Sequence, residues 1–375
     1  MTATPNADKL LVPSATAWRE FEEAVALRRD MVHDYLNKWP GAAEFKPADI
    51  HDAIFSYLER RGKGLRPVLL LLCCGAVGGD EAQAIPAAAA VEVFHIWTLV
   101  HDDIIDRDDT RRGSPTVHAL YKRHAQAEHN VPAEEAAHYG TTVAILTGDL
   151  QQSWTYSLLA DLTERGVEPR LVIDLIKRMS SSLTPQLMEG EMLDVQFSFK
   201  QPDLLSEKDV LHMLTRKTAA LLEYSAWCGA CIGLAGAADI RGFAANLGKF
   251  ASLCGTAFQL HDDLLGLTGD EQLLGKPVGS DVREGKTTLI MHKALARASS
   301  AERTVLLSAL GNSAASRELI SDVLHIVEST NAQKDVVQLA NLYIDQALTL
   351  LYSLPDSSYR RLLSTWATFL LVRKH

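Results

Sequence analysis

The chain has 375 residues, of which 47% are hydrophobic and 22% are charged, a composition typical of a globular protein with a sizeable core. Its formal net charge is −10 at pH 7. Because nucleic-acid surfaces are built from clustered Lys and Arg, this acidic balance argues against a nucleic-acid partner and leaves only local sites for phosphate groups. The five cysteines, an odd number, are typical of reduced thiols, and no secretory signal is visible, so we expect a cytoplasmic location.

The spacing of apolar residues predicts the fold class. Residues 1–14 are polar and aperiodic, and we expect them to be disordered. Beyond them, apolar residues recur at three- and four-residue spacing and the alternation typical of strands is scarce, so residues 15–375 are predicted to form a single all-α domain. The predicted helices lie at residues 18–36, 50–60, 66–77, 85–106, 139–160, 170–182, 204–232, 241–267, 286–298 and 335–352.

Two stretches need separate interpretation. The longest apolar stretch, Ile85–Val100, is shorter than the roughly 20 residues that a membrane span requires. We therefore expect a buried core helix there and no membrane span. The segment 122–138 is rich in His, Ala and Glu and carries Pro132. We expect it to be a surface insertion in the form of a solvated loop, whose histidines bind no metal.

Two clusters of acidic residues lie in otherwise apolar, helix-like stretches. The first contains Asp102, Asp103 and Asp106, which helical spacing places on one side of a helix, and the second contains Asp262 and Asp263. Like charges on one helix face repel each other unless a cation neutralises them. The apolar neighbours indicate that the acids line a pocket. Carboxylate oxygens suit Mg²⁺, which binds them together with substrate phosphates.

Basic residues suited to a diphosphate accompany the acid clusters. Helix N-termini and Arg side chains both bind phosphate oxygens. The candidates occur at the predicted start of a helix, just after the first acid cluster and further along the chain: Lys63, Arg66, Arg111, Arg112, Lys217, Lys276 and Lys286. Each of them alone is typical of a solvated surface charge, so the interpretation depends on the whole set.

In their order along the chain, these motifs resemble those of the trans-isoprenyl diphosphate synthases, or polyprenyl synthetases. The motifs are Gly62-Lys63-x-x-Arg66-Pro67, Asp102-Asp103-x-x-Asp106, Arg111-Arg112-Gly113, Lys217-Thr218, Gln259-x-x-Asp262-Asp263, and Gly269-Asp270 through Gly275-Lys276. The resemblance implies an all-α bundle around a deep central cavity, with the two Asp-rich helices facing each other at its mouth. It also implies a homodimer.

The resemblance implies an enzyme that condenses isopentenyl diphosphate with an allylic prenyl diphosphate to give a linear trans-prenyl diphosphate. Magnesium, as three ions bridging the diphosphate, would act with basic side chains to stabilise the leaving group while the allylic C–O bond ionises. The double bond of isopentenyl diphosphate would then attack the carbocation. The released diphosphate would take up the proton.

The resemblance also implies a role for each motif residue. The diphosphate of isopentenyl diphosphate would be held by Lys63, Arg66, His95 and Arg112. Magnesium would be bound by Asp102, Asp103, Asp106, Asp262 and Asp263. The allylic diphosphate would be gripped by Arg111, Lys217 and Lys276. The allylic chain near the developing cation would be faced by Thr218 and Gln259, and the closed site would be supported by Lys286.

The sequence departs from the family pattern at two places. Gly266 stands where many relatives carry a third aspartate of the second acid cluster, which puts one metal ligand in doubt. Gly190-Glu191 replaces the family's Gly-Gln pair, with Glu189 and Asp194 beside it. We interpret these acids as structural or as minor contributors to the site.

The length of the product would be set by residues upstream of the first acid cluster. In the family the product grows along this helix, and Trp97, Thr98 and Phe94 lie five, four and eight positions before Asp102. A bulky indole floor resembles that of short-chain enzymes. The small Thr98 leaves room that favours geranylgeranyl over farnesyl diphosphate. The alternative is that Trp97 is an ordinary core residue.

Two other functions remain open from the sequence. A terpene cyclase ionises the same substrates at a similar Asp-rich helix, but it needs neither the Lys63 and Arg66 pair nor a second Asp-Asp cluster. A non-catalytic subunit of a heteromeric synthase would keep the fold and lose acid motifs. Gly266 is the feature that favours this second alternative.

Overall fold

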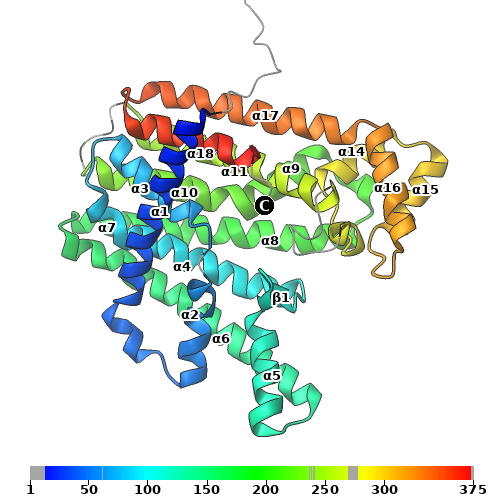
Figure 1. Ribbon diagram of the computed structural model, residues 1–375, viewed down its shortest axis with the longest axis horizontal. Helices are drawn as coiled ribbons and strands as arrows, with labels where there is room; N and C mark the ends of the chain where they lie inside the picture. The colour runs from blue at the N-terminus through cyan, green and yellow to red at the C-terminus, as the bar shows by residue number, and fades with distance from the viewer. Residues whose placement is uncertain are drawn as a thin grey trace, which may run out of the picture. The chain divides into compact units, whose positions relative to one another are not determined.

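A computed structural model describes residues 13–60, 62–235, 237, 239, 241–268 and 278–372. Contacts divide the chain into two compact units, which we call the first unit (Met1–Phe21, Arg178–Ala226 and Ile240–His375) and the second unit (Glu22–Lys177 and Trp227–Asp239). The regular structure is almost entirely helical, which confirms the all-α prediction (Figure 1). The single domain stays a prediction. Most of the segment expected to be disordered, residues 1–12, lies outside the described residues.

The second unit is built around helix α4 (Glu81–Ile105). Its other helices are α2 (Ala48–Glu59), α3 (Leu65–Ala76), α5 (Val117–His129), α6 (Ala133–Ala160) and α7 (Pro169–Arg178), and both units share α1 (Ala15–Asn37) and α10 (Ala220–Gly233). Asp80 caps α4 by accepting a hydrogen bond from the backbone N–H of Ala82 at 2.9 Å. By length and composition α4 could cross a membrane, and 72% of its most apolar window is buried inside the protein.

The segment 122–138 is not a loop, contrary to the sequence prediction. Most of it belongs to helices α5 and α6, which are joined by a short turn in which Asn130 has a left-handed φ of 48°. Tyr121 and Ala125, one helical turn apart on α5, are 5% and 1% exposed. Ala, Lys, Arg and Glu favour helix, and Pro132 is tolerated because it immediately precedes the first turn of α6.

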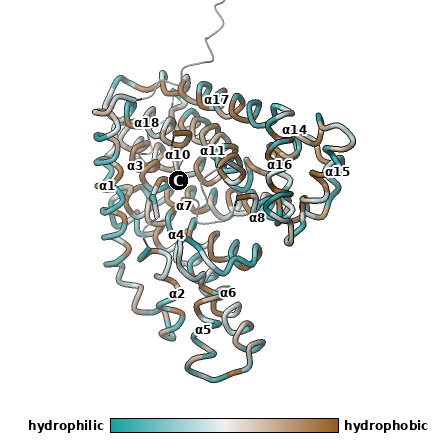
Figure 2. The backbone as a smooth tube through the Cα atoms, turned by 45° about the vertical axis from the view of Figure 1, so that its right-hand side comes forward, coloured by the Kyte–Doolittle hydropathy of each residue, from teal (hydrophilic) through white to brown (hydrophobic). Residues whose placement is uncertain are grey.

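The first unit has helix α11 (Phe243–Thr268) in its core. The other helices of the unit are α8 (Thr184–Phe199), α9 (Glu207–Leu214), α13 (Ser280–Arg283), α14 (Leu289–Arg297), α15 (Ser300–Ala309), α16 (Arg317–Ser329), α17 (Ala332–Leu350) and α18 (Ser358–Val372). The sequence did not predict α8, α13, α15, α16 or α18. Helix α17 is amphipathic: it carries hydrophobic and hydrophilic residues along its length (Figure 2), and Val336, Ala340 and Ile344, spaced four residues apart, are buried. The rings of Phe250 on α11 and Trp366 on α18 lie 6.1 Å apart.

Two helical stretches contain π-helical turns. The predicted helix 204–232 consists of α9, the π turn η5 (Thr215–Ala219) and α10, and the π turn η3 (Met179–Leu183) precedes α8. Such turns occur frequently at functional sites. Turn η5 carries Lys217 and Thr218, two of the predicted site residues.

Candidate active site

The first acid cluster lies at the end of α4, in the second unit. Carboxylate oxygens of Asp102 and Asp106 lie within 4.8 Å of each other. Asp103 is turned into the protein, where its Oδ1 accepts a hydrogen bond from Arg111 Nε at 2.6 Å and its Oδ2 accepts one from the Tyr57 hydroxyl. Successive residues of a helix are rotated by about 100°, so Asp106 returns to the side of Asp102 and Asp103 does not. The expected convergence of three carboxylates is thus corrected to two.

Arg111 neutralises the first acid cluster from a short hairpin. Strand β1 (Thr110–Arg111) pairs with β2 (Ser114–Pro115), and the turn between them has φ values of 53° at Arg112 and 73° at Gly113. Besides its bonds to Asp103, Arg111 Nη2 lies 3.5 Å from Asp102 Oδ2. Burial lowers the pKa of Arg111, but the hydrogen bond and charge of Asp103 raise this pKa above its ordinary value. The guanidinium therefore remains cationic.

A narrow pocket beside this cluster is lined by basic, acidic and apolar side chains. The lining residues are Tyr57, Arg60, Glu92, His95, Ile96, Leu99, Arg111 and Arg112. Arg66 Nη1 lies 3.1 Å from His95 Nε2. Because a guanidinium only donates hydrogen bonds, His95 accepts at Nε2 and its ring is neutral. Burial and the charges of Arg66 and Arg112 hold the pKa of His95 well below its ordinary value.

The segment before α3 reaches the same pocket. A Cβ atom at Gly62 would lie only 3.0 Å from Arg112 Nη1, so the absence of a side chain there makes room for the guanidinium. Lys63 follows as an exposed residue. The structure thus brings Arg66 against His95 and places His95 and Arg112 in the lining of one pocket, with Lys63 in the adjoining segment. Their role in binding a diphosphate stays a prediction.

Glu92 is a pocket residue that the sequence analysis missed. It is 6% exposed, and burial raises the pKa of its carboxyl group, while the positive charges of Arg66 and Arg112 oppose this shift. A carboxylate between two such guanidiniums reduces their mutual repulsion. A signal was present in the sequence, because a lone Glu in an apolar helix three residues before His95 falls near the same helix face.

The second acid cluster lies on α11, in the first unit. Thr218 Oγ1 donates to Gln259 Oε1 at 2.8 Å, and Gln259 Nε2 donates to Asp263 Oδ1 at 2.9 Å. Burial, followed by the charges of Asp281 and Asp262, raises the pKa of Asp263 to about 8. Among the described residues, the buried Oδ2 of Asp263 has no hydrogen-bond partner.

Lys217 is held by two acids of α8. Its Nζ lies 2.7 Å from Asp194 Oδ2 and 3.0 Å from Glu191 Oε2. Gly190 allows this approach, because a Cβ atom there would collide with the backbone nitrogen of Lys217. The acids near the Gly-Glu pair therefore position a predicted diphosphate ligand, which is a more specific role than the sequence indicated.

The remaining predicted basic residues lie further along the first unit. Lys286 Nζ is 3.1 Å from Glu284 Oε2, and its backbone N–H donates to the carbonyl oxygen of Asp281 at 2.9 Å. Lys276 lies outside the described residues, together with the rest of the predicted motif from Gly269 to Gly275.

The predicted chain-length residues are packed on α4. Trp97 is 3% exposed, and its ring makes edge contacts with Phe94 at 4.8 Å and with His101 at 6.0 Å between centroids. Thr98 donates its hydroxyl to the carbonyl oxygen of His95 at 2.7 Å. Trp97 and Phe94 therefore form one aromatic cluster, and its role as a floor stays a prediction.

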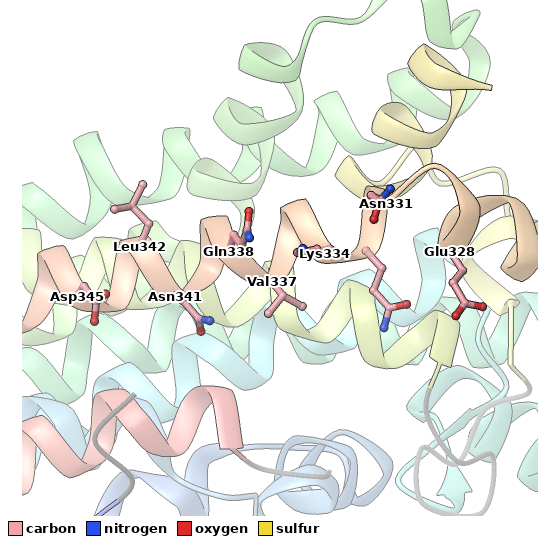
Figure 3. A pocket seen from close by; sticks show the side chains of 9 residues that line it. Glu328, Asn331, Lys334, Val337, Gln338, Asn341, Leu342 and Asp345 are labelled. Carbon is pink, nitrogen blue, oxygen red and sulfur yellow. The ribbon is translucent and has the colours of Figure 1, made fainter. Parts of the chain in front are cut away.

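A separate surface cavity of about 750 Å³ lies along α16 and α17 in the first unit (Figure 3). It is lined by Glu328, Asn331, Gln333, Lys334, Val337, Gln338, Asn341, Leu342 and Asp345. These side chains are mostly uncharged amides and mixed charges from one helix face, and they lie outside the family motifs. The cavity is therefore not the predicted diphosphate site.

The chain is similar over most of its length to proteins of one family. The sequence model described as polyprenyl synthetase matches residues 47–327. A geranylgeranyl diphosphate synthase of Sulfolobus acidocaldarius is 34% identical over 338 residues, which cover 90% of this chain and 92% of that protein.

Solved structures agree with this match. A geranylgeranyl pyrophosphate synthetase from Pyrococcus horikoshii has a TM-score of 0.81 at 30% identity, covering 94% of this chain and 99% of that one. A geranylgeranyl pyrophosphate synthase from Corynebacterium glutamicum, complexed with isoprenyl diphosphate and magnesium, has a TM-score of 0.81 at 27% identity with the same coverage. The chain belongs to the polyprenyl synthetase family.

Family membership implies Mg²⁺, and the residues present fit this ion. All the candidate ligands are carboxylate oxygens, the donors that Mg²⁺ prefers. Asp102 and Asp106 bring two of them together on one helix. In the first unit, the buried Asp263 Oδ2 lacks a hydrogen-bond partner among the described residues, and a cation would supply one.

Proposed function

We propose that this protein condenses isopentenyl diphosphate with allylic prenyl diphosphates to make a linear trans-prenyl diphosphate. The observation that carries the proposal is a group of basic side chains beside the acid cluster on α4: Arg66 contacts His95, and His95 lines one pocket with Arg111 and Arg112. A terpene cyclase binds one diphosphate, whereas a condensing enzyme must bind a second one next to the metal site. These cationic side chains supply the charge that a second diphosphate requires.

The chain's own residues divide the work of this reaction. Arg66 and Arg112 bind the diphosphate of isopentenyl diphosphate, and the neutral His95 adds a ring nitrogen hydrogen bond without a further charge. Asp102 and Asp106 act as metal ligands. Asp103 positions Arg111 and does not itself face the metal. Bound Mg²⁺ supplies charge neutralisation of the allylic diphosphate, which favours its departure as a leaving group.

In the first unit, the hydrogen-bonded series from Thr218 through Gln259 to Asp263 fixes the orientation of each side chain. The hydroxyl and amide oxygens place partial negative charge near the allylic carbons, where positive charge develops. Lys217 binds the allylic diphosphate, and Glu191 and Asp194 hold its amine in place until then. Asp262 and Asp263 act as the second pair of metal ligands, with three Mg²⁺ ions in the complete site.

We further propose geranylgeranyl diphosphate as the main product, with farnesyl diphosphate as the shorter alternative. The support is the aromatic cluster of Trp97 and Phe94 together with the small Thr98. The names of the similar proteins from Sulfolobus acidocaldarius and Pyrococcus horikoshii agree with this length. We also propose a cytoplasmic homodimer in which residues 15–375 act as one domain.

The test is to incubate the purified protein with Mg²⁺, labelled isopentenyl diphosphate and each of dimethylallyl, geranyl, farnesyl and geranylgeranyl diphosphate. We expect a linear alcohol of twenty carbons after dephosphorylation, and its loss in Asp102→Ala. Cyclic hydrocarbon formed without isopentenyl diphosphate would assign a cyclase. An inert chain that restores activity to a separate synthase subunit would assign a non-catalytic subunit.

A further inference from the structure

The short hairpin that carries Arg111 and Arg112 needs support from other elements. It lies between the end of α4 and the start of α5 in the second unit (Figure 1), and each of its strands has only two residues. A two-stranded hairpin is only marginally stable by itself. Its turn also holds Arg112 at a left-handed φ of 53°, a conformation that residues other than glycine adopt at a cost.

The two arginines of the hairpin are held to different degrees. Arg111 is bound by the carboxylates of Asp102 and Asp103. The Arg112 guanidinium lines the pocket, but it has no hydrogen bond or ion pair with any residue that the structure describes. The place of its charge therefore depends on the backbone of the hairpin, and so on whatever holds that backbone.

The end of helix α2 provides this hold. Arg60, the residue that caps α2, donates from Nη1 to the carbonyl oxygen of Pro115 in β2 at 2.8 Å. Pro115 is the register partner of Thr110, so the contact acts on both strands. Tyr57, three residues before Arg60, accepts a hydrogen bond at its hydroxyl oxygen from the backbone N–H of Val117 at 3.3 Å. Both ends of the segment 115–117 are thus tied to α2.

Tyr57 also fixes the direction in which Arg60 donates. The Arg60 guanidinium lies over the Tyr57 ring, 5.3 Å from its centroid. Tyr57 is 4% exposed, and its hydroxyl also donates to Asp103, so the ring is a rigid support. A planar guanidinium stacked on an aromatic ring keeps a defined orientation, which a flexible ammonium group does not. Arg60 lines the same pocket as Arg112.

We propose that Arg60, seated on the ring of Tyr57, is a positioning residue for the binding of isopentenyl diphosphate. By holding β2, it fixes the backbone from which Arg112 reaches the diphosphate. Arg60 lies outside the sequence motifs of the family resemblance, and it acts through Arg112. The inference rests on the proposed function and names a further residue on which the same site depends.

The test compares the single variants Arg60→Ala, Arg60→Lys and Arg112→Ala with the double variant that combines Arg60→Ala and Arg112→Ala. Arg165→Ala is the matched control, because Arg165 is an exposed arginine of the same unit whose guanidinium lies 5.6 Å from the centroid of the Tyr35 ring. Calorimetry measures the binding of isopentenyl diphosphate alone, so that no condensation occurs. Hydrogen exchange of residues 107–117 in the ligand-free protein measures how firmly the hairpin is held.

We expect Arg60→Ala to speed exchange in the hairpin and to weaken binding about tenfold, the effect of losing a hydrogen bond from a charged group. KM for isopentenyl diphosphate should rise equally, with KM for the allylic substrate unchanged because Arg111 keeps its acids. Arg60→Lys should show smaller changes in the same direction. In the Arg112→Ala background, Arg60→Ala should change binding by less than about twofold. Arg165→Ala should match the wild type.

Two outcomes would overturn the inference. One is unchanged hairpin exchange in Arg60→Ala, which would mean that Arg60 does not hold the hairpin. The other is a double variant in which the two losses multiply, because Arg60 would then act on the diphosphate independently of Arg112. A wild-type chain that bound no isopentenyl diphosphate and elongated no starter would instead contradict the proposed function, and the exchange measurement would still decide whether Arg60 holds the hairpin.

Discussion

The charge of Asp263 makes the stability of the metal-free protein depend on pH. Burial, then the neighbouring acids, raises the pKa of this carboxyl group to about 8 in the folded protein, from 3.8 in the absence of these effects. Between these two values the folded protein binds a proton that the unfolded chain does not. The stability that the protonated Asp263 carboxyl group contributes is therefore fully present below the pKa of this group in the unfolded chain. It is lost as the pH rises through the pKa of the group in the folded protein.

The expected magnitude follows from this one proton. A full proton of difference changes the free energy of unfolding by about 1.4 kcal/mol per pH unit. Between about pH 5 and 7, we expect the free energy of unfolding of the wild-type protein to fall by about 1.4 kcal/mol per pH unit relative to that of Asp263→Asn, whose amide does not titrate. Above about pH 8 the two curves should become parallel, because both folded and unfolded carboxyl groups are then ionised.

Urea unfolding in EDTA across this pH range measures the difference between the two proteins. Other titrating groups contribute equally to both, so the difference in slope reports Asp263 alone. Mg²⁺ with inorganic diphosphate should reduce the wild-type slope, because a bound cation favours the ionised carboxylate. Equal slopes for wild type and Asp263→Asn in EDTA would refute the reasoning.

Three further substitutions test the site. Trp97→Ala should lengthen the products, as sized by chromatography after dephosphorylation, and unchanged products would make Trp97 an ordinary core residue. Asp103→Asn should lower the free energy of unfolding by about 3 kcal/mol in urea, because it leaves the largely buried Arg111 without its acceptor charge; a loss below about 1 kcal/mol would contradict this ion pair's role. Glu92→Gln should raise KM for isopentenyl diphosphate about tenfold, as expected for a lost interaction with a charged group, with KM for the allylic substrate unchanged. An equal rise in both KM values would indicate a general structural defect.

Much of the fold could be predicted from the sequence, because the amphipathic period of a helix is local. The spacing of apolar residues placed α1, α2, α3 and α4 within a few residues of their observed ends. It failed for α5, where a segment rich in His and Glu was interpreted as a loop although Tyr121 and Ala125 bury one face. Composition there resembled a solvated loop, and only the packing against α6 revealed a buried face.

The sequence by itself determined the family and the chemistry, since the acid and basic motifs occur in an order that specifies magnesium and diphosphate. Tertiary structure decided which side chains act together. It separated Asp103 from Asp102 and Asp106, placed Glu92 beside the pocket, and brought Asp281 against Gly266. The physical reason is that motif spacing describes neighbours on one helix, whereas the partner of a buried charge comes from any element that packs against it.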